Sequence, residues 1–291
     1  MINRQLDIKR NFVYNENNQL LNIGCGNRYH KDWINVDFHS TGENVISHNL
    51  LNGIPFENER FSIVYHSHVI EHFSKEDAPK FIAECYRVLK PNGIIRIAFP
   101  DFEKIVKQYI RLLNELKKGN EQCEADYDWI MLELLDQTVR NVSGGEMLKY
   151  CIRESIPNEK FLIECSGTEI KNLIEYGRRC VSNHKNDNSI KSASKNLLKK
   201  LKRKGKNIIM SISRENSREF KIGKFRLGGE IHQWMYDSYS LGRLLKMVGF
   251  KDIIIRDAFT SYFNNWQQYN LDTEIDGSVY KPDSTYIEAI K

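Results

Sequence analysis

The sequence predicts an α/β protein whose sheet is mostly parallel, and three observations support this prediction. Apolar runs of strand length occur at residues 20–24 and 34–38. The first run ends in Gly24-Cys25-Gly26, and the second carries Asp37. A third run, residues 94–99, is apolar except for Arg96, as is typical of a strand buried on both faces of a parallel sheet. Glycines and acids at the carboxyl ends of such strands are expected at the ligand-binding edge of the sheet.

The remaining elements follow in order between turn residues. Short strands are expected at residues 45–48 and 61–66. A helix is expected to begin at Ser74, with Asp77 three residues on, and to end at the turn formed by residues 90–93. Apolar residues recur every three or four positions at 102–118, 126–139 and 239–248, which predicts three further helices, the last capped by Gly249. Residues 252–256 and 284–290 would form the last two strands, as an antiparallel pair because no helical pattern separates them.

Two connections in this scheme are unusual. Only residues 27–32 separate Gly26 from the second strand region, too few for the dozen or so residues of a normal crossover helix. The connection at residues 259–282 is instead long and rich in aromatic residues. Aromatic rings there could bind sugars, but core packing is the simpler interpretation. The short connection either reduces the first helix to a turn or requires another segment to cover that part of the sheet.

The chain of 291 residues is long enough for one large α/β domain with an insertion. We expect an N-terminal arm at residues 1–18, the sheet domain at 19–118 and 229–291, and a largely helical insertion at 119–228. Long insertions over the edge of a rigid sheet often control access to a ligand. The insertion is therefore predicted to be a lid or a cap that binds a substrate.

The charge distribution and the cysteines limit the compartments and partners that the protein is expected to have. The net charge of +5 is concentrated in a basic run at residues 191–206. Such a run can contact an anionic membrane surface or nucleic acid, although a solvated helix face is the simpler interpretation. No stretch approaches the roughly 18 consecutive apolar residues of a membrane span, and the first residues lack a signal-peptide core. Six scattered cysteines without a Cys-x-x-Cys pair indicate free thiols. We expect a cytoplasmic protein, with any membrane contact peripheral and at the inner face.

The glycine turn and the acid that follows it suit a nucleotide-like ligand. Without a Cβ, Gly24 and Gly26 let the backbone turn sharply and let a ligand lie against its amides. The Asp37 carboxylate can accept both hydroxyl protons of a ribose. A Gly-x-Gly pair alone is a weak signal, because ordinary strand-to-loop turns also contain it. The ordered strands that follow it strengthen the interpretation.

With these pieces, the sequence resembles class I S-adenosylmethionine-dependent methyltransferases over residues 19–101 and again from about 230 to 291. The shared pieces are Asn-Ile-Gly-Cys-Gly at 22–26, Asn-Val-Asp at 35–37, His-Val-Ile-Glu-His at 68–72 and Trp-Met-Tyr-Asp at 234–237. More narrowly, it is similar to predicted bacterial methyltransferases of surface-polysaccharide biosynthesis. The resemblance implies a Rossmann-like, seven-stranded, mostly parallel sheet with helices on both faces. It also implies S-adenosylmethionine as cofactor, held by residues at the sheet edge: Gly24, Cys25, Gly26, Asp37, Phe38, Asn49, Leu50, His66 and Ser67.

Methyl transfer to a hydroxyl requires alignment of the acceptor and removal of one proton. The candidates for handling the acceptor are His68, His72, Asp101 and His232, because each can accept a proton. His68, His72 and Asp101 are also expected at the same sheet edge. A single histidine is more often a structural group than a catalytic one. For His66, which lies in a predicted strand, we expect a structural role and no part in proton transfer. His68-x-x-Glu71-His72 also forms a candidate site for a divalent metal. It resembles the Glu-x-x-Glu-His cluster of ubiquinone-pathway and small-RNA methyltransferases, with His68 in place of the first acid.

The sequence thus favours a methyltransferase acting on a hydroxyl of a small-molecule sugar or a glycan precursor. Two alternatives stay open. The basic insertion could serve a methyltransferase that binds nucleic acid, and the short first connection could mark a non-catalytic relative that acts as a partner protein. The sequence does not determine the oligomeric state.

Overall fold

The computed structural model describes residues 19–186 and 217–291. The N-terminal arm at 1–18 and the basic run at 191–206 lie outside these residues. The chain divides into two compact units, which we describe separately. The first contains described residues up to 111, 164–167 and 232–291, and the second contains 112–163 and 168–231 apart from the undescribed segment. The first unit ends at residue 111 and resumes at 232, where the sequence placed the boundaries at 118 and 229, and residues 164–167 also belong to it.

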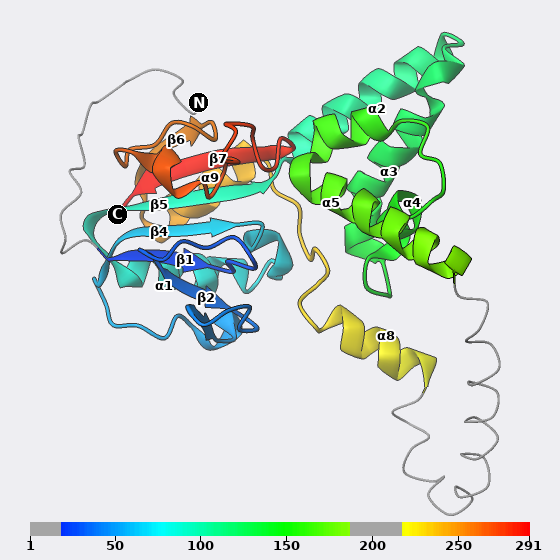
Figure 1. Ribbon diagram of the computed structural model, residues 1–291. Helices are drawn as coiled ribbons and strands as arrows, with labels where there is room; N and C mark the ends of the chain where they lie inside the picture. Colours follow the sequence, from blue (N-terminus) through cyan, green and yellow to red (C-terminus); the bar gives the residue numbers. More distant parts are fainter. Residues whose placement is uncertain (1–18, 187–216) are drawn as a thin grey trace, which may run out of the picture. The chain divides into compact units, whose positions relative to one another are not determined.

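The first unit is built on a seven-stranded sheet, as predicted (Figure 1). Its strands are β1 (Leu20–Ile23), β2 (Ile34–Asp37), β3 (Val45–Ser47), β4 (Phe61–Ser67), β5 (Leu89–Pro100), β6 (Lys251–Arg256) and β7 (Ser284–Ile290). The spatial order is β3-β2-β1-β4-β5-β7-β6, and β7 alone runs antiparallel to its two neighbours. The carboxyl ends of the parallel strands therefore meet the start of β7 at one edge of the sheet.

The helix α1 (Ala78–Val88) begins four residues later than predicted. The reason is local, because the Ser74 hydroxyl donates to the Asp77 carboxylate at 2.9 Å and accepts from the Asp77 amide at 3.1 Å, which closes a separate turn before the helix. The strand β5 begins at Leu89, directly after this helix, although the sequence placed a turn at residues 90–93 and a strand from 94.

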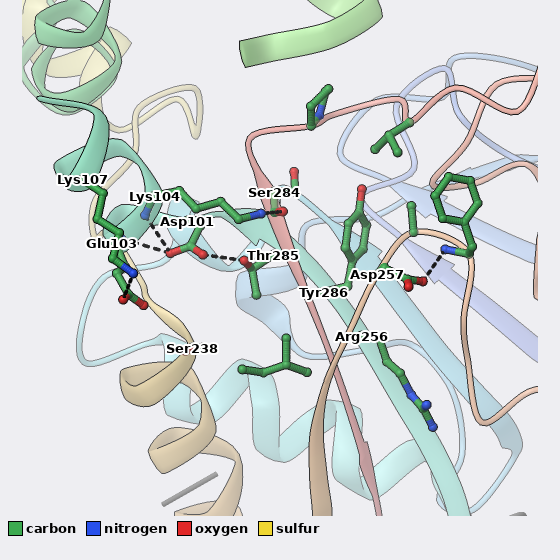
Figure 2. A pocket seen from close by; sticks show the side chains of 15 residues that line it. Asp101, Glu103, Lys104, Lys107, Ser238, Arg256, Asp257, Ser284, Thr285 and Tyr286 are labelled. Atoms are coloured by element: carbon green, nitrogen blue, oxygen red, sulfur yellow. Dashed lines mark hydrogen bonds and ion pairs between the residues drawn. The ribbon is translucent and has the colours of Figure 1, made fainter. Parts of the chain in front are cut away.

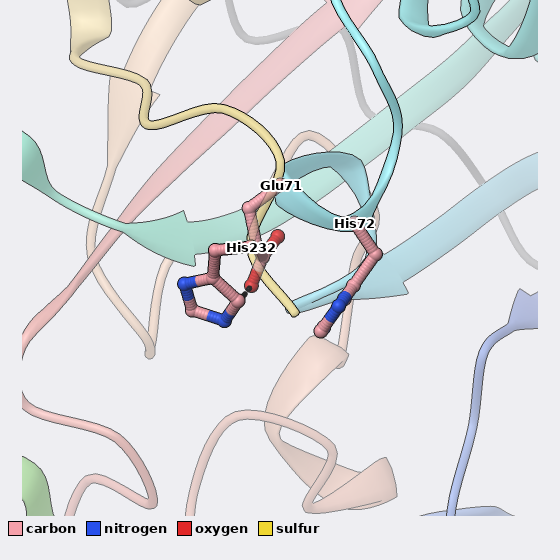
Figure 3. A group of neighbouring side chains, drawn as sticks. All are labelled: Glu71, His72 and His232. Atoms are coloured by element: carbon pink, nitrogen blue, oxygen red, sulfur yellow. Dashed lines mark ion pairs between the residues drawn. The ribbon is translucent and has the colours of Figure 1, made fainter. Parts of the chain in front are cut away.

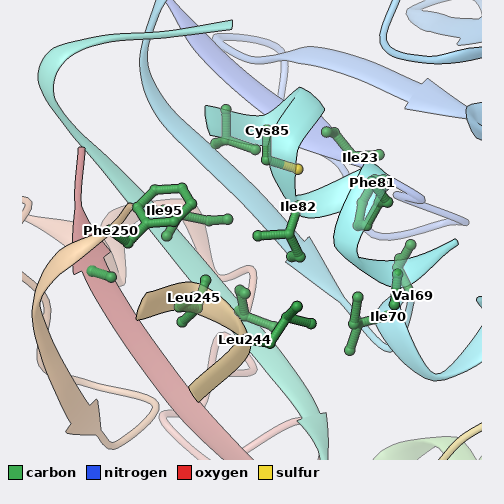
Figure 4. Packing of buried hydrophobic residues seen from close by; sticks show 14 of the residues in the cluster. Ile23, Val69, Ile70, Phe81, Ile82, Cys85, Ile95, Leu244, Leu245 and Phe250 are labelled. Atoms are coloured by element: carbon green, nitrogen blue, oxygen red, sulfur yellow. The ribbon is translucent and has the colours of Figure 1, made fainter. Parts of the chain in front are cut away.

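One face of the sheet is covered by α1 and by α9 (Ser238–Val248). Phe81, Ile82 and Cys85 of α1 and Leu244 and Leu245 of α9 pack over the apolar strand residues (Figure 4). The helix α9 ends at Gly249, whose φ of 116° lies in the left-handed region, as the predicted cap requires. This face is the main core of the unit.

The opposite face is covered by the long aromatic connection between β6 and β7. Phe263, Trp266, Tyr269 and Leu271 form a buried cluster with the sheet residues Leu20, Ile63, Tyr65 and Ile94 and with Trp33. The Trp33 ring meets the rings of Trp266 and Tyr269 edge to face, at 5.9 and 5.4 Å between centroids. The aromatic residues thus serve core packing, as preferred from the sequence. They cover the strands next to the short first connection, so this segment takes the place of a first crossover helix.

A buried ionic network fixes this connection to the sheet. Arg96 of β5 is 1% exposed and binds Asp272 at 2.8 Å and Glu288 of β7 at 2.9 Å. The Asp272 carboxylate also accepts hydrogen bonds from Tyr65 at 2.6 Å and from Trp266 at 3.1 Å. Because these donors and acceptors are paired, the polar residue within the β5 run is accommodated in the interior.

The second unit is helical in its described part. It contains the end of α2 (Phe102–Lys117), η3 (Glu121–Cys123), α3 (Glu124–Val139), α4 (Gly145–Cys151), most of α5 (Glu159–Asn186) and α8 (Arg218–Arg226). The predicted helices at 102–118 and 126–139 are present within two residues of their expected ends. The buried Asp136 of α3 accepts a hydrogen bond from the Glu146 amide at 2.8 Å and so holds the start of α4. Among the described helices, none is long and apolar enough to cross a membrane.

Candidate active site

The predicted glycine turn follows β1 directly. Gly24 and Gly26 have φ values of 63° and 52°, a region that favours glycine. A Cβ on Gly24 would lie 2.3 Å from a methyl of Val69, whereas one on Gly26 would meet no atom within 4 Å. The Gly26 amide donates to the Asp37 carboxylate at 2.8 Å. The structure therefore brings the turn and the predicted ribose acid into direct contact.

The other predicted cofactor residues at this turn differ in accessibility. Phe38 is 52% exposed, whereas Cys25 is 5% exposed, with its thiol 3.7 Å from the Gly26 carbonyl oxygen. Burial raises the pKa of the Cys25 thiol to about 12, with the nearby Asp37 carboxylate adding to the shift, so the thiol stays protonated. Asn49 accepts a hydrogen bond from the Leu51 amide at 3.0 Å and so caps the short helix η1 (Leu50–Asn52). Leu50 is partly buried and packs against the main core.

The side chain of His66, a predicted cofactor residue, is buried in the core. Its side chain is 0% exposed and lies against Phe81 of α1, at 5.2 Å between ring centroids. Burial lowers its pKa to about 3, so the imidazole is neutral. Neither ring nitrogen has a hydrogen-bond partner among the described residues. The side chain belongs to the core, because position 66 points to the α1 face, and only its backbone can serve the edge. Ser67, the last residue of β4, is partly exposed at that edge.

His68 and Asp101 are joined to the same short segment at the start of β7. The His68 Nε2 atom lies 2.7 Å from the Ser284 hydroxyl. The Asp101 carboxylate accepts from the neighbouring Thr285 hydroxyl and, at 3.0 Å, from the Glu103 amide at the start of α2. Sequence analysis missed Ser284 and Thr285. The signal was present, because an antiparallel strand must begin where its parallel neighbour ends.

Three side chains from two distant segments form a compact cluster (Figure 3). Glu71 and His72 come from η2 (Ile70–His72), and His232 comes from the segment before α9. One potential ligand atom of each lies within 4.8 Å of the others. The His232 Nε2 atom is 3.9 Å from the Glu71 carboxylate, and the two imidazole rings are 4.9 Å apart. Glu71 and His232 are 1% and 4% exposed, whereas His72 is partly exposed.

The compact cluster contains His232 in the place that the predicted metal site gave to His68. His68 contacts Glu71 at 3.5 Å through Nδ1, but its other ring nitrogen lies on Ser284, and His232 completes the compact group instead. The close spacing of His68, Glu71 and His72 in the sequence predicted that these three side chains would form the site. In fact His68 has a φ of 54°, and η2 begins only at Ile70, so the three do not share one regular turn.

Backbone hydrogen bonds hold the two segments of the cluster together. The amides of Gln233 and Trp234 both donate to the Glu71 carbonyl, at 2.7 and 3.2 Å. Burial lowers the pKa of His68 well below its ordinary value, and the positive charges of Lys281 and neighbouring imidazoles add to the shift. Burial also raises the pKa of the nearby Tyr236 hydroxyl to about 12, assisted by the Glu71 carboxylate. The site is therefore sheltered from solvent and has a carboxylate at its centre.

A hollow of about 450 Å³ opens beside Asp101 (Figure 2). Its walls come from the ends of β5 and β6, the start of α2 and the start of β7. Two aromatic side chains, Phe259 and Tyr286, also line it. The charged side chains in its walls are equal in number and opposite in sign: Lys104, Lys107 and Arg256 against Asp101, Glu103 and Asp257. A volume of this size falls within the range of small-molecule sites.

Comparisons with known proteins give one family match and several similar solved structures. Residues 21–97 match the sequence profile of a family described as "Methyltransferase domain". No curated protein matches the sequence. Among solved structures, the chain is similar to S-adenosylmethionine-dependent methyltransferases of Thermotoga maritima and Archaeoglobus fulgidus. Each is 13% identical with a TM-score of 0.36, over 94% of this chain and 82% or 86% of theirs.

A phosphoethanolamine N-methyltransferase of Haemonchus contortus, solved with S-adenosylmethionine, is 11% identical with a TM-score of 0.37. The similarity covers 97% of this chain and 50% of that one. These scores are too low to transfer an acceptor from any of the three. The profile match instead coincides with the glycine turn, the acid at the end of β2 and the sheet edge described above. Over residues 21–97 the chain is therefore similar to methyltransferase domains.

Proposed function

We propose that the protein methylates a hydroxyl of a sugar or glycan precursor in bacterial surface-polysaccharide biosynthesis. The proposal that the acceptor is a hydroxyl rests on the sheltered cluster of Glu71, His72 and His232, which lies at the same sheet edge as the glycine turn. A hydroxyl must lose a proton when it is methylated, and imidazole and carboxylate groups can take that proton. The polysaccharide context is supported by the sequence resemblance alone.

The roles of the chain's own residues follow from their positions. The turn at Gly24 and Gly26 lets the cofactor lie against backbone amides, and Asp37 is free to exchange its bond to Gly26 for bonds to ribose hydroxyls. When bound, S-adenosylmethionine supplies an activated methyl group. His72, the partly exposed member of the cluster, is the group best able to reach the acceptor hydroxyl and to accept its proton. Glu71 and His232 hold it from the buried side.

The hollow beside Asp101 suits a neutral, hydroxyl-rich acceptor. The opposite charges in its walls cancel, so it offers no net attraction to a polyanion. Polar side chains beside Phe259 and Tyr286 provide hydrogen bonds together with aromatic faces, a combination that binds sugar rings. These features favour a sugar over a nucleic acid for the described part of the chain.

The test is transfer of radiolabelled methyl from S-adenosylmethionine to a panel of acceptors. The panel contains neutral oligosaccharides, nucleotide sugars, anionic lipid-linked sugars and RNA. We expect labelling of a saccharide and a loss of at least 100-fold in rate for His72→Gln, within the usual range for removing a general base. Labelling of RNA alone, with binding that falls steeply as salt rises, would replace this proposal by the nucleic-acid alternative.

A divalent metal at Glu71, His72 and His232 is a second candidate role for the same cluster. Two imidazoles and one carboxylate are a donor set that zinc, manganese and iron accept, with further positions left for an acceptor. A metal held there would act as a Lewis acid. In this role His72 would be a ligand, and the proton would need a different acceptor.

Metal content of the purified full chain, measured by mass spectrometry after exposure to zinc or manganese, separates the two roles. About one metal per chain, lost in His232→Gln but retained in His30→Gln, would favour the metal site. His30 is the matched control because it also lies near a carboxylate, 3.7 Å from Asp32, but is outside the cluster. Metal-free protein with full methyl transfer would exclude this role.

A further inference from the structure

The short connection after the glycine turn lacks the helix that would normally satisfy its own peptide groups. Two buried amide side chains, from β1 and β2, replace those bonds. Asn22 donates to the Arg28 carbonyl at 3.0 Å, and Asn35 donates to the carbonyls of His30 and Trp33 at 3.0 and 2.8 Å. Asn22 and Asn35 are each 1% exposed. The backbone of the connection is thus held from beneath by the sheet.

From above, the connection is held by the segment between β6 and β7, and Arg28 makes the polar contacts. Its guanidinium binds both oxygens of Glu274, at 3.1 and 3.2 Å, and donates to the Thr273 carbonyl. The same group lies 4.0 Å from the centre of the Tyr280 ring. One guanidinium nitrogen, Nη1, contacts both Glu274 oxygens, and the other, Nη2, donates to Thr273. Together with the nearby Tyr280 ring, these contacts hold the planar group in one orientation.

Arg28 is also tied to the glycine turn. Its amide donates to the Cys25 carbonyl at 2.8 Å, which closes the turn that contains Gly26. Gly26 in turn donates to Asp37. A displacement of Arg28 therefore moves the amides against which the cofactor is proposed to lie.

We infer that Arg28 is a positioning residue for S-adenosylmethionine, and that the segment at 272–280 supports the cofactor site through it. In this role the segment does what a first crossover helix would do, holding the turn in the geometry that binds the cofactor. The inference rests on the proposed function, since it requires a cofactor at Gly24 and Gly26. It explains how a chain without that helix keeps a competent turn.

A double-mutant cycle in the full chain tests this inference. The measurements are calorimetric dissociation constants for S-adenosylhomocysteine, made well below each variant's melting temperature. Arg28→Met keeps the apolar part of the side chain and removes the guanidinium group. Glu274→Gln removes the negative charge that the guanidinium binds. We expect Arg28→Met to raise the dissociation constant by about tenfold. Arg28→Lys should raise it by less, since lysine keeps the charge that pairs with Glu274 but cannot also donate to Thr273 from a planar group. The double variant should bind no more weakly than Arg28→Met alone, because both changes remove one contact.

Arg87→Met is the matched control. Arg87 also pairs with a carboxylate, Glu84 at 2.7 Å, and donates to a backbone carbonyl, that of Ile54 at 2.8 Å, but it does not touch the turn. It should lower the melting temperature without changing the dissociation constant. If Arg28→Met lowers the melting temperature and binds like the wild type, Arg28 is only structural and the inference is wrong. If the two substitutions raise the dissociation constant by factors that multiply in the double variant, Arg28 does not act through Glu274. If the wild type itself binds no cofactor, the proposed function fails instead.

Discussion

Replacement of Asp272 by alanine should strongly destabilise the first unit. The Asp272 side chain is 1% exposed and accepts from three buried side chains: Arg96 and Tyr65 at 2.8 and 2.6 Å, and Trp266 at 3.1 Å. Leaving a buried donor unsatisfied costs roughly 1–3 kcal/mol, and breaking a buried ion pair from one side costs about 3–5 kcal/mol. Glu288 still binds Arg96 in the variant, which limits the loss. We therefore expect a decrease of about 4 kcal/mol in the free energy of unfolding.

Urea unfolding followed by tryptophan fluorescence measures this loss, since Trp266 lies in the network. Asp272→Asn provides a milder variant if the alanine protein does not fold, because it keeps the shape and one acceptor oxygen. Glu103→Ala is the control, because Glu103 forms an exposed pair with Lys107 that should contribute less than about 1 kcal/mol. If Asp272→Ala costs less than about 1 kcal/mol, the network does not anchor the connection and the reasoning fails.

Three further outcomes are expected. Asp37→Ala should weaken S-adenosylhomocysteine binding by roughly tenfold to 100-fold in calorimetry, because it removes charge-assisted hydrogen bonds worth on the order of 1.5–3 kcal/mol. Unchanged affinity would mean that a different residue binds the ribose. Gly24→Ala should impair the same binding, since its Cβ would lie 2.3 Å from Val69 at a φ of 63°; normal binding would show that the turn adapts. In the folded protein the pKa of His66 is about 3, below its ordinary value of 6.5. The contribution of the neutral, buried His66 to the free energy of unfolding is therefore complete above about pH 6.5 and decreases as the pH falls towards 3. At pH 5 the loss is about 2 kcal/mol, so denaturation should show a smaller acid-induced loss for His66→Leu than for the wild type, and equal losses would contradict the burial argument.

The sequence by itself determined the local pattern of the sheet domain. Strands from Leu20 to Ile290 lie within a few residues of their predicted positions, because buried strands require apolar runs and the turns between them require glycine, proline or polar residues. The contact between Gly26 and Asp37 was also predictable, since parallel neighbouring strands end at the same edge. The two exceptions at α1 and β5 come from turn chemistry near Ser74 and from strand pairing that continues back to Leu89.

Only the tertiary structure decided which distant residues meet. His232 joins Glu71 and His72 across 160 positions of sequence, and no local spacing could choose it over His68. The inward direction of His66 likewise depends on the face that α1 covers. The short first connection could be read from the sequence, but the segment that compensates for it could not. That compensation rests on Arg28 meeting Glu274 and on Trp33 packing against Trp266, long-range contacts that form only when the chain closes on itself.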